Sequence, residues 1–246
     1  MELKKEEYKE IFITIINKII SKIFLKKETG HSALLSFLKN LDEHKNFFEE
    51  EGGPRVLSSE AQTGLFGEIY FLSEVLSREL NVTEANHCWT GPYKKHDFST
   101  LKILLETKTS KLKSKKIINT TFDQINPDQE KPLYLIFLNI DESNNEKNLN
   151  YIISEYGKKL KEQADESYND FCLKLLKVGY HEIHSEHYKQ AYEVKKELYY
   201  FINKDFPHIS DITKPDAIED LKLLYKINLD KCDEFLINKK DFINKI

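Results

Sequence analysis

The chain has 246 residues, of which 40% are hydrophobic and 32% are charged, and its formal net charge is −4 at pH 7. These values predict a soluble globular chain of one large or two small domains, and they exclude a uniformly basic protein that coats nucleic acid. No apolar run approaches the ~20 residues that a transmembrane helix needs. Three widely spaced cysteines indicate no disulfide framework, so we expect a cytoplasmic protein.

Two amphipathic helices are predicted at the N-terminus. Apolar residues recur at mostly helical spacing over residues 4–25 and again over residues 31–48. The acidic and glycine-rich run 49–54 ends the second helix and forms a loop. Ser58 or Ser59 can then cap the next helix.

That next helix, predicted for residues 60–80, carries a carboxylate on its apolar face. On the helical wheel Glu68 falls between Leu72 and Val75. A carboxylate that faces a core needs a partner. One interpretation is a boundary residue that pairs with a lysine or arginine.

A short strand over residues 86–89 and a turn over residues 90–92 are predicted next. Trp89, the only tryptophan, either packs in the core or supports the neighbouring loop. We expect it to pack in the core because of its large apolar area.

Charged residues interrupt the apolar stretch that follows. Asp97, Glu106 and Lys108 lie in and beside a leucine-rich run, where a plain buried strand would not carry two carboxylates and an amine. Residues two apart on a strand share a face, so Glu106 and Lys108 project together, roughly 6–7 Å apart along the axis. If the chain reverses around residues 99–102, Asp97 returns on an antiparallel strand within about 5–8 Å of Glu106.

Two carboxylates this close repel each other unless a cation lies between them. Oxygen ligands from one or two carboxylates, completed by water and phosphate, suit Mg²⁺ better than zinc or calcium. A metal and an amine at one site indicate phosphodiester hydrolysis. The metal would polarise a phosphoryl oxygen and activate the attacking water, and Lys108 would orient that water or stabilise the developing charge.

The segment from residue 94 to residue 116 is strongly basic, with eight lysines against two acids. Local positive potential governs affinity for phosphates, although a lysine run is usually a solvated face. We favour phosphate binding because of the neighbouring carboxylates. His96 could contact phosphate or be a neutral histidine of the core. The predicted DNA-binding residues are Lys94, Lys95, His96, Lys111, Lys113, Lys115 and Lys116.

The second half of the chain alternates helical and strand patterns. Residues 117–126 are predicted as a helix that carries Gln124, and residues 133–138 as a buried strand. Two helices are expected over residues 144–177, strands over 192–202 and 222–229, and a closing helix over 232–246. His181, His184 and His187 recur every three residues, but no Cys-x-x-Cys lies nearby, so zinc is disfavoured.

The pattern of Asp97 followed by Glu106-Thr107-Lys108 resembles the PD-(D/E)XK nuclease superfamily, with His96 where proline is common. Ahead of it stand Gly64-Leu65-Phe66-Gly67-Glu68 and Trp89-Thr90-Gly91-Pro92. With these segments the chain looks like the bacterial group labelled only as PD-(D/E)XK motif proteins, which is found among restriction and phage-defence genes. Looser matches continue into the C-terminal half.

The resemblance implies a mixed α/β fold with a restriction-endonuclease-like core, in which a central mixed sheet is flanked by helices. The implied order is helix, three strands, helix, strand. Asp97 and Glu106 would bind Mg²⁺, for which Mn²⁺ could substitute. Glu68 would complete the metal site directly or through water, and Gln124 would lie near the substrate or a metal-bound water.

We expect a helical segment over residues 1–57, the nuclease core over 58–142, and a mixed α/β extension over 143–246, packed as one compact unit. The implied function is a metal-dependent DNA endonuclease of a restriction or phage-defence system. It would act as a homodimer or with other defence proteins. One alternative is a DNA-binding or assembly subunit that keeps the fold without cleaving; another is an accidental motif in a helical scaffold.

Overall fold

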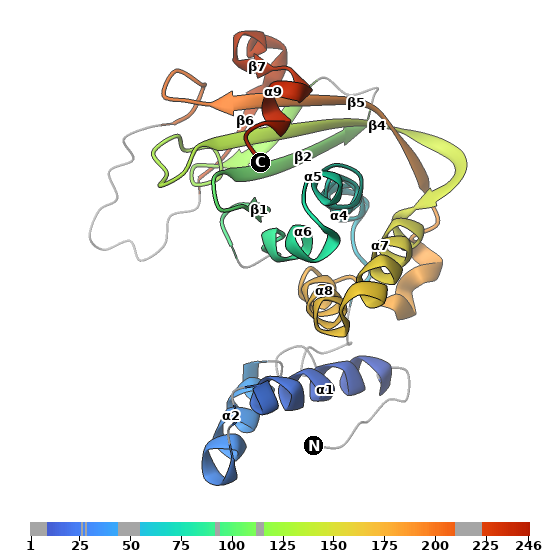
Figure 1. Cartoon of the computed structure of the whole chain (residues 1–246). Coiled ribbons are helices and arrows are strands. Elements are labelled where there is room, and N and C mark those ends of the chain that lie inside the picture. Colours follow the sequence, from blue (N-terminus) through green and yellow to red (C-terminus); the bar gives the residue numbers. More distant parts are fainter. Residues whose placement is uncertain are drawn as a thin grey trace.

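The structure is a computed structural model that describes residues 9–25, 27, 29–43, 55–91, 94–111, 116–209 and 223–246. A mixed five-stranded sheet in the order β1-β2-β4-β5-β7 forms its centre (Figure 1). The expected fold class, a mixed α/β core with helices flanking a central sheet, is confirmed. The strands are β1 (Phe98–Ser99), β2 (Leu104–Lys111), β4 (Leu133–Asn148), β5 (Ala191–Ile202) and β7 (Leu236–Ile237).

Strand β4 is the middle of the sheet because it is apolar on both faces. It pairs in parallel with β2 and antiparallel with β5, and β1 pairs antiparallel with β2. The residues from Leu133 to Leu138 are all buried, as the continuous apolar run predicts. The strand predicted for 133–138 is therefore confirmed, and it continues to Asn148.

A long helical stretch packs against this sheet. It comprises α4 (Ser59–Phe71), the π-helical η2 (Leu72–Leu76) and α5 (Ser77–Glu79). The predicted cap is confirmed because the Ser58 hydroxyl accepts a hydrogen bond from the Ala61 N–H at 3.2 Å. The helix predicted for residues 60–80 is thus also confirmed.

The strand predicted for residues 86–89 is wrong. Those residues lie largely in helix α6 (Val82–Cys88), which begins where the Asn81 side chain accepts a hydrogen bond from the Glu84 N–H at 2.9 Å. An Asn cap satisfies a free N–H of the first turn and favours the helix. Only Trp89 pairs with the sheet, through a single antiparallel bridge to Phe98.

The helix predicted for residues 117–126 is also wrong. Residues 117–121 form strand β3 (Ile117–Thr121), which pairs antiparallel with β6 (Leu224–Asn228), and Gln124 lies in the turn that follows. Ile118 and Thr120 are buried while their neighbours are more exposed, which is the period of a strand. The β-branched residues of this segment also favour a strand. The implied order of helix, three strands, helix and strand therefore does not hold.

Helices and short turns make up the C-terminal half. The two helices expected over residues 144–177 are present, although β4 takes the first five of those residues, and the strands expected over 192–202 and 222–229 are confirmed as β5 and β6. The closing helix over 232–246 is wrong, because Asn238 starts a separate short helix by accepting from the Asp241 N–H. The elements are α7 (Leu149–Gln163), α8 (Asp165–Lys177), η3 (Glu182–His187), η4 (Leu229–Lys231), η5 (Asp233–Phe235) and α9 (Lys239–Ile243).

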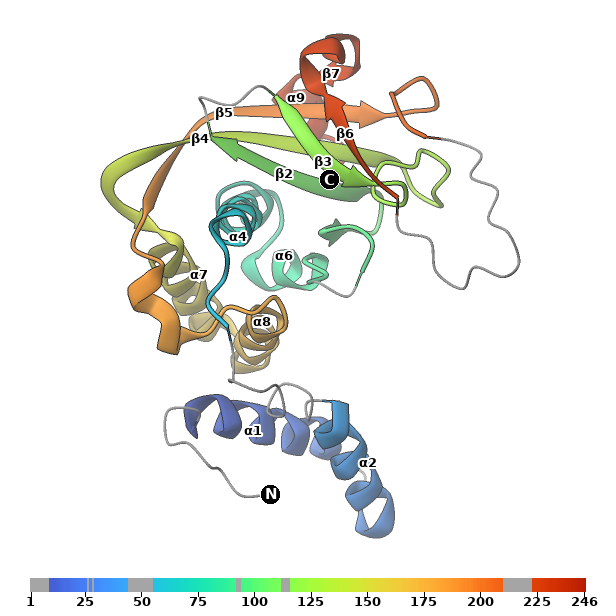
Figure 2. The same cartoon turned by 180° about the vertical axis from the view of Figure 1, so that it is seen from behind.

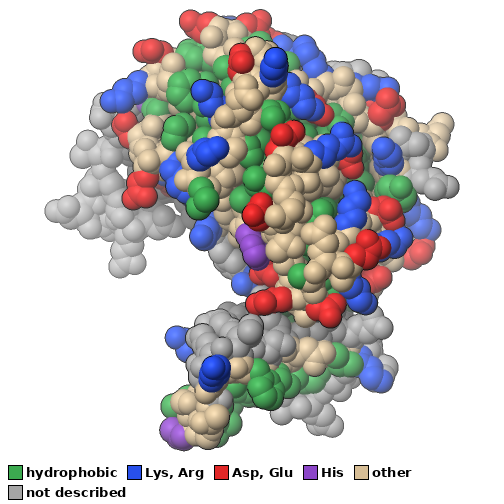
Figure 3. Space-filling model, in the orientation of Figure 1, with side chains coloured by type: hydrophobic (Ala, Val, Ile, Leu, Met, Phe, Trp, Pro, Cys, Tyr) green, Lys and Arg blue, Asp and Glu red, His purple; other side chains and the backbone are tan. Residues whose placement is uncertain are grey.

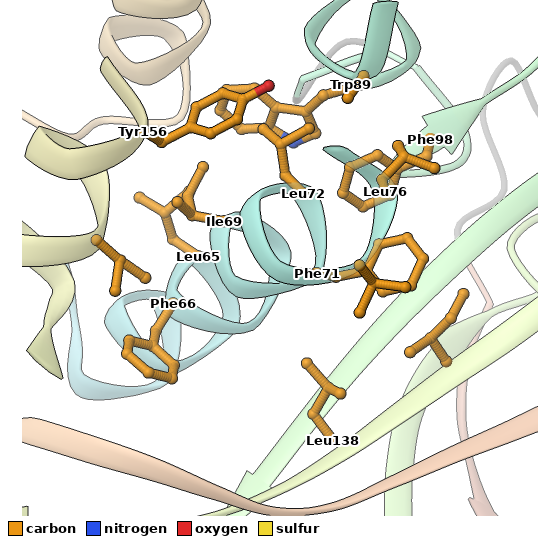
Figure 4. Packing of buried hydrophobic residues seen from close by; sticks show 14 of the residues in the cluster. Leu65, Phe66, Ile69, Phe71, Leu72, Leu76, Trp89, Phe98, Leu138 and Tyr156 are labelled. Carbon is orange, nitrogen blue, oxygen red and sulfur yellow. The ribbon is translucent and has the colours of Figure 1, made fainter. Parts of the chain in front are cut away.

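The sheet has a hydrophobic cluster on each face. Alternate residues of β4, such as Ile136 and Leu138, join the helices α4, α6, α7, α8 and α9 in the larger cluster, part of which Figure 4 shows around α4. Residues between them, such as Leu135 and Phe137, join β3 and β6 in the other cluster. Figure 2 shows β3 and β6 crossing this second face.

Two N-terminal helices lie beyond α8, on the side away from the sheet (Figure 1). These are α1 (Lys9–Leu25) and α2 (Gly30–Glu43), which confirm the predicted pair within the described residues; residues 4–8 and 44–54 lie outside them. Ile15 and Ile19 of α1 pack against Leu173 of α8. In the described part of the chain, no helix is long and apolar enough to cross a membrane.

Candidate active site

The turn between β1 and β2 brings the two halves of the motif together. The Thr100 N–H donates to the Ile103 carbonyl at 2.9 Å, and the Thr100 hydroxyl accepts from the Ile103 N–H at 3.0 Å. The reversal predicted around residues 99–102 is therefore present. Because Phe98 pairs with Leu105, the preceding residue, Asp97, lies beside Glu106 on the neighbouring strand.

Asp97 is held against β2 by the main chain of that strand. Its Oδ2 accepts a hydrogen bond from the Thr107 N–H at 2.7 Å, and its carbonyl accepts from the Thr90 N–H at 2.9 Å. A carboxylate tied to a backbone N–H next to Glu106 cannot turn away from it without losing a charge-assisted hydrogen bond. The structure thus holds the Asp97 carboxylate against the strand that carries Glu106.

Glu106 is fully buried, which is unusual for a carboxylate. The Lys108 Nζ lies 2.7 Å from Glu106 Oε1, as expected for residues two apart on one face of a strand. On the other side the His96 Nδ1 lies 3.7 Å from Glu106 Oε2, and His96 is 5% exposed. Within the described residues Oε2 has no hydrogen-bond donor.

Burial and the charges of neighbouring carboxylates raise the pKa values of Asp97 and Glu68. Burial raises the pKa of Asp97 well above its usual range, and the charges of Glu106 and Glu68 raise it further. Burial also raises the pKa of Glu68 to about 7, although the Trp89 indole lowers it. Burial opposes the charge of Lys108, but the carboxylates of Glu106 and Asp97 outweigh it, so the pKa of Lys108 is raised.

Glu68 reaches the cluster from helix α4, and the indole of Trp89 holds it. The Trp89 Nε1–H donates to Glu68 Oε2 at 2.9 Å, and Trp89 is fully buried against Phe171. Trp89 therefore packs in the core, as expected, and also supplies the partner that Glu68 needs. No pattern in the sequence indicates this pair, whose two residues are 21 positions apart.

Gln124 enters the site from the turn after β3 rather than from a helix. Its Oε1 accepts a hydrogen bond from Lys108 Nζ at 3.2 Å and lies 3.3 Å from the Thr121 N–H. The resemblance implies a helix here, whereas a turn carries Gln124. Its predicted role in the site stays a prediction.

The described lysines of the basic segment lie on the surface or near it, and several pair with acids. In Figure 3 basic and acidic side chains are mixed on the visible face. Lys113 and Lys115 lie outside the described residues, so their predicted DNA contacts are not placed. The recorded ion pairs are Lys95–Asp123 at 3.9 Å, Lys111–Glu142 at 2.7 Å and Lys116–Asp230 at 3.1 Å, and Lys94 is exposed.

The residues present fit a divalent cation with oxygen ligands. The buried carboxylate of Glu106 and the half-buried carboxylate of Asp97 lie at the paired strands β1 and β2, and Glu106 Oε2 has no hydrogen-bond donor in the described structure. Among the described residues no three His, Cys, Asp or Glu side chains form a complete ligand group. Mg²⁺ needs only one or two protein carboxylates because water and phosphate complete its shell.

Two cavities lie away from this cluster. One of about 920 Å³ lies between α7 and α8, and one of about 400 Å³ lies where α4, α7 and β5 meet. Neither is lined by the motif residues. The motif residues are therefore gathered at the β1–β2 pair and not in either cavity.

Comparison with known proteins gives one match. The model of the family described as "Putative PD-(D/E)XK family member, (DUF4420)" matches residues 1–230, which include every residue of the candidate site. No curated protein and no solved structure matches the chain. The mixed sheet that carries the motif also contradicts the interpretation as an accidental motif in a helical scaffold.

Proposed function

The chain belongs to the DUF4420 family of PD-(D/E)XK proteins, and from this premise we propose that it is a metal-dependent DNA endonuclease of a bacterial restriction or phage-defence system. The observation that carries the proposal is the convergence of Asp97, Glu106 and Lys108 on the β1–β2 pair. Glu106 is buried, and its Oε2 has no donor among the described residues. A buried carboxylate in that state is costly unless a cation binds it.

Asp97 and Glu106 would hold the Mg²⁺ or Mn²⁺ ion, with Glu68 as a further ligand directly or through water. When bound, such an ion supplies Lewis-acid polarisation of the phosphoryl oxygen and a lowered pKa of the attacking water. The Thr107 N–H fixes the Asp97 carboxylate, so the ligand arrangement exists before substrate arrives.

Lys108 would act as a hydrogen-bond donor and not as a base. Its raised pKa keeps the ammonium charged at neutral pH, and a charged ammonium has no lone pair to accept a proton. Held between Glu106 and Gln124, it can donate to a phosphoryl oxygen or orient the attacking water. Both actions stabilise the negative charge that develops on the phosphate.

The test is cleavage of plasmid and phage DNA by purified protein with Mg²⁺ or Mn²⁺. EDTA should stop cleavage, and Asp97→Asn and Lys108→Met should lower it by at least about 100-fold, the lower bound for one catalytic group. Asp165→Asn and Lys158→Met change exposed residues of α8 and α7 and should cleave like wild type. Wild-type protein that is inert on all DNA forms, alone and with its neighbouring gene products, refutes the proposal.

The second candidate is a DNA-binding or assembly subunit without cleavage. It is favoured by the finding that no complete group of three metal ligands is present among the described residues. Under this alternative, DNA binding persists in EDTA and in Asp97→Asn, and wild type does not cleave. The same preparations measured by gel shift and by cleavage therefore separate the two functions.

A further inference from the structure

His96 lies inside the candidate site with both ring nitrogens available. The residue is 5% exposed, and within the described structure neither Nδ1 nor Nε2 has a hydrogen-bond partner. Leaving a buried polar nitrogen unbonded costs about 1–3 kcal/mol. A buried imidazole in this position therefore indicates a ligand that the described part of the chain does not supply.

The distance to Glu106 suits two ligands of one ion. His96 Nδ1 and Glu106 Oε2 are 3.7 Å apart, which is too long for a good hydrogen bond. Two donor atoms that each lie about 2.1 Å from one ion are about 3.0–4.2 Å apart, depending on the angle between them. Glu106 Oε2 also has no donor among the described residues. One cation could therefore bind both of the atoms that face each other.

Lys108 does not compete with a cation for Glu106 Oε2. Its Nζ contacts the other oxygen of Glu106, Oε1, and Gln124 Oε1. Asp97 Oδ2 accepts a hydrogen bond from the Thr107 N–H. The side of Glu106 toward His96 is thus the one left for a cation.

We propose that His96 is a protein ligand of the catalytic metal beside Glu106, and that its nitrogen makes the site prefer Mn²⁺ to Mg²⁺. This inference rests on the proposed function. Mg²⁺ takes oxygen ligands, whereas imidazole is a ligand of transition metals, so a nitrogen ligand shifts selectivity toward Mn²⁺. His96 then has a role different from contacting phosphate on the surface.

The first experiment uses electron paramagnetic resonance of Mn²⁺ bound to full-length protein without DNA. A directly bound imidazole gives a nitrogen coupling in the spin-echo signal, and ¹⁵N-labelled histidine should change that coupling. The coupling should disappear in His96→Leu and remain in His87→Leu, where His87 is an exposed histidine of α6. Because the chain has eight histidines, only the loss of the coupling in a variant assigns it to His96, and His96→Asn is the second variant if His96→Leu does not fold.

The second experiment is calorimetric titration with Mn²⁺ and with Mg²⁺. His96→Leu should weaken Mn²⁺ binding by about 10-fold or more and Mg²⁺ binding by less, while His87→Leu should match wild type. If Mn²⁺ binds, Glu106→Gln abolishes that binding, and wild type shows no nitrogen coupling, the inference is overturned while the proposed function stands. Equal weakening of both ions in His96→Leu also overturns it. Wild-type protein that binds neither ion overturns both.

Discussion

Lys108 is the side chain that links the motif to the rest of the fold. Its ammonium lies 2.7 Å from Glu106 on its own strand and donates to Gln124 in the turn after β3. Because a flexible lysine is held by two partners from different elements, its position depends on both. We therefore predict that Gln124 positions Lys108.

Replacing Gln124 by methionine should lower DNA cleavage by about 10–100-fold, the range found when a supporting partner of a site residue is removed. The side-chain length is kept, so the unfolding midpoint should change little. Gln163→Met, at the exposed end of α7, is the matched control and should cleave normally. Unchanged cleavage by Gln124→Met would contradict the positioning role.

At the scale of elements, helix α4 approaches strand β2 closely through Gly67. A Cβ placed at Gly67 would lie 1.8 Å from the Thr109 Oγ1 and 3.0 Å from its Cβ. Glycine is required here by space and not by a special backbone angle. This contact sets the distance between Glu68 of α4 and the strand that carries Glu106.

Gly67→Ala should destabilise the protein by about 1–3 kcal/mol, because the helix or the strand must move to admit a methyl group. Gly64→Ala is the control on the same helix, since a Cβ there meets nothing within 4 Å. That variant should be neutral or gain up to about 1 kcal/mol from helix propensity. Urea denaturation of both variants measures the difference, and equal stabilities would refute the close approach.

The short helix η3 and the residue before it, His181, carry the three histidines that recur every three residues in the sequence. The ring centroids of His181 and His184 are 6.0 Å apart, and those of His184 and His187 are 6.3 Å apart. A 3₁₀-helix has three residues per turn, so side chains three apart eclipse one another. Burial, with a contribution from His184, lowers the pKa of His181 to about 4.

This pKa predicts a loss of stability in mild acid. Between about pH 6.5 and pH 4 the unfolded chain binds a proton at His181 while the folded chain does not, so stability falls as pH falls. From pH 6.5 to pH 5 the titration of His181 lowers the free energy of unfolding by up to about 2 kcal/mol. His181→Gln should reduce the difference in unfolding free energy between pH 7 and pH 5, and His87→Gln should leave it unchanged.

At the scale of the whole molecule, the main core does not depend on the N-terminal helices. Among the residues that the structure describes, none before Leu57 belongs to the two clusters on the faces of the sheet. The helices α1 and α2 contribute to a separate small cluster with Leu173 and Leu176 of α8. The division of the chain near residues 57 and 142 stays a prediction, and its first boundary can be tested.

A chain that begins at Arg55 should fold cooperatively, because both large clusters remain. Exposing Leu173 should cost about 2 kcal/mol, which corresponds to a lowering of Tm by about 4–8 °C for a protein of this size. Thermal unfolding followed by circular dichroism measures this shift, with Leu173→Ser in the full chain for comparison. A truncated chain without a cooperative transition would show that α1 and α2 belong to the core.

Local periodicity in the sequence determined the helix that carries Glu68, the buried strand β4, and the pairing of Glu106 with Lys108 on one face. These features depend on residues within a few positions of one another, and an apolar period of 3.6 or 2 records them directly. The turn that returns Asp97 to Glu106 is equally local. The motif and its family resemblance could be recognised in the sequence for the same reason.

Other features depend on contacts between segments that are distant in the sequence, and only the tertiary structure decided them. Residues 117–121 became a strand because β6 lies beside them, more than 100 positions later in the chain, and residues 82–88 became a helix that α7 and α8 cover. The burial of His96 against Glu106 and the bond from Trp89 to Glu68 likewise depend on packing between elements. Pairing energies between distant segments outweigh weak local propensities, so no local pattern could have shown these contacts.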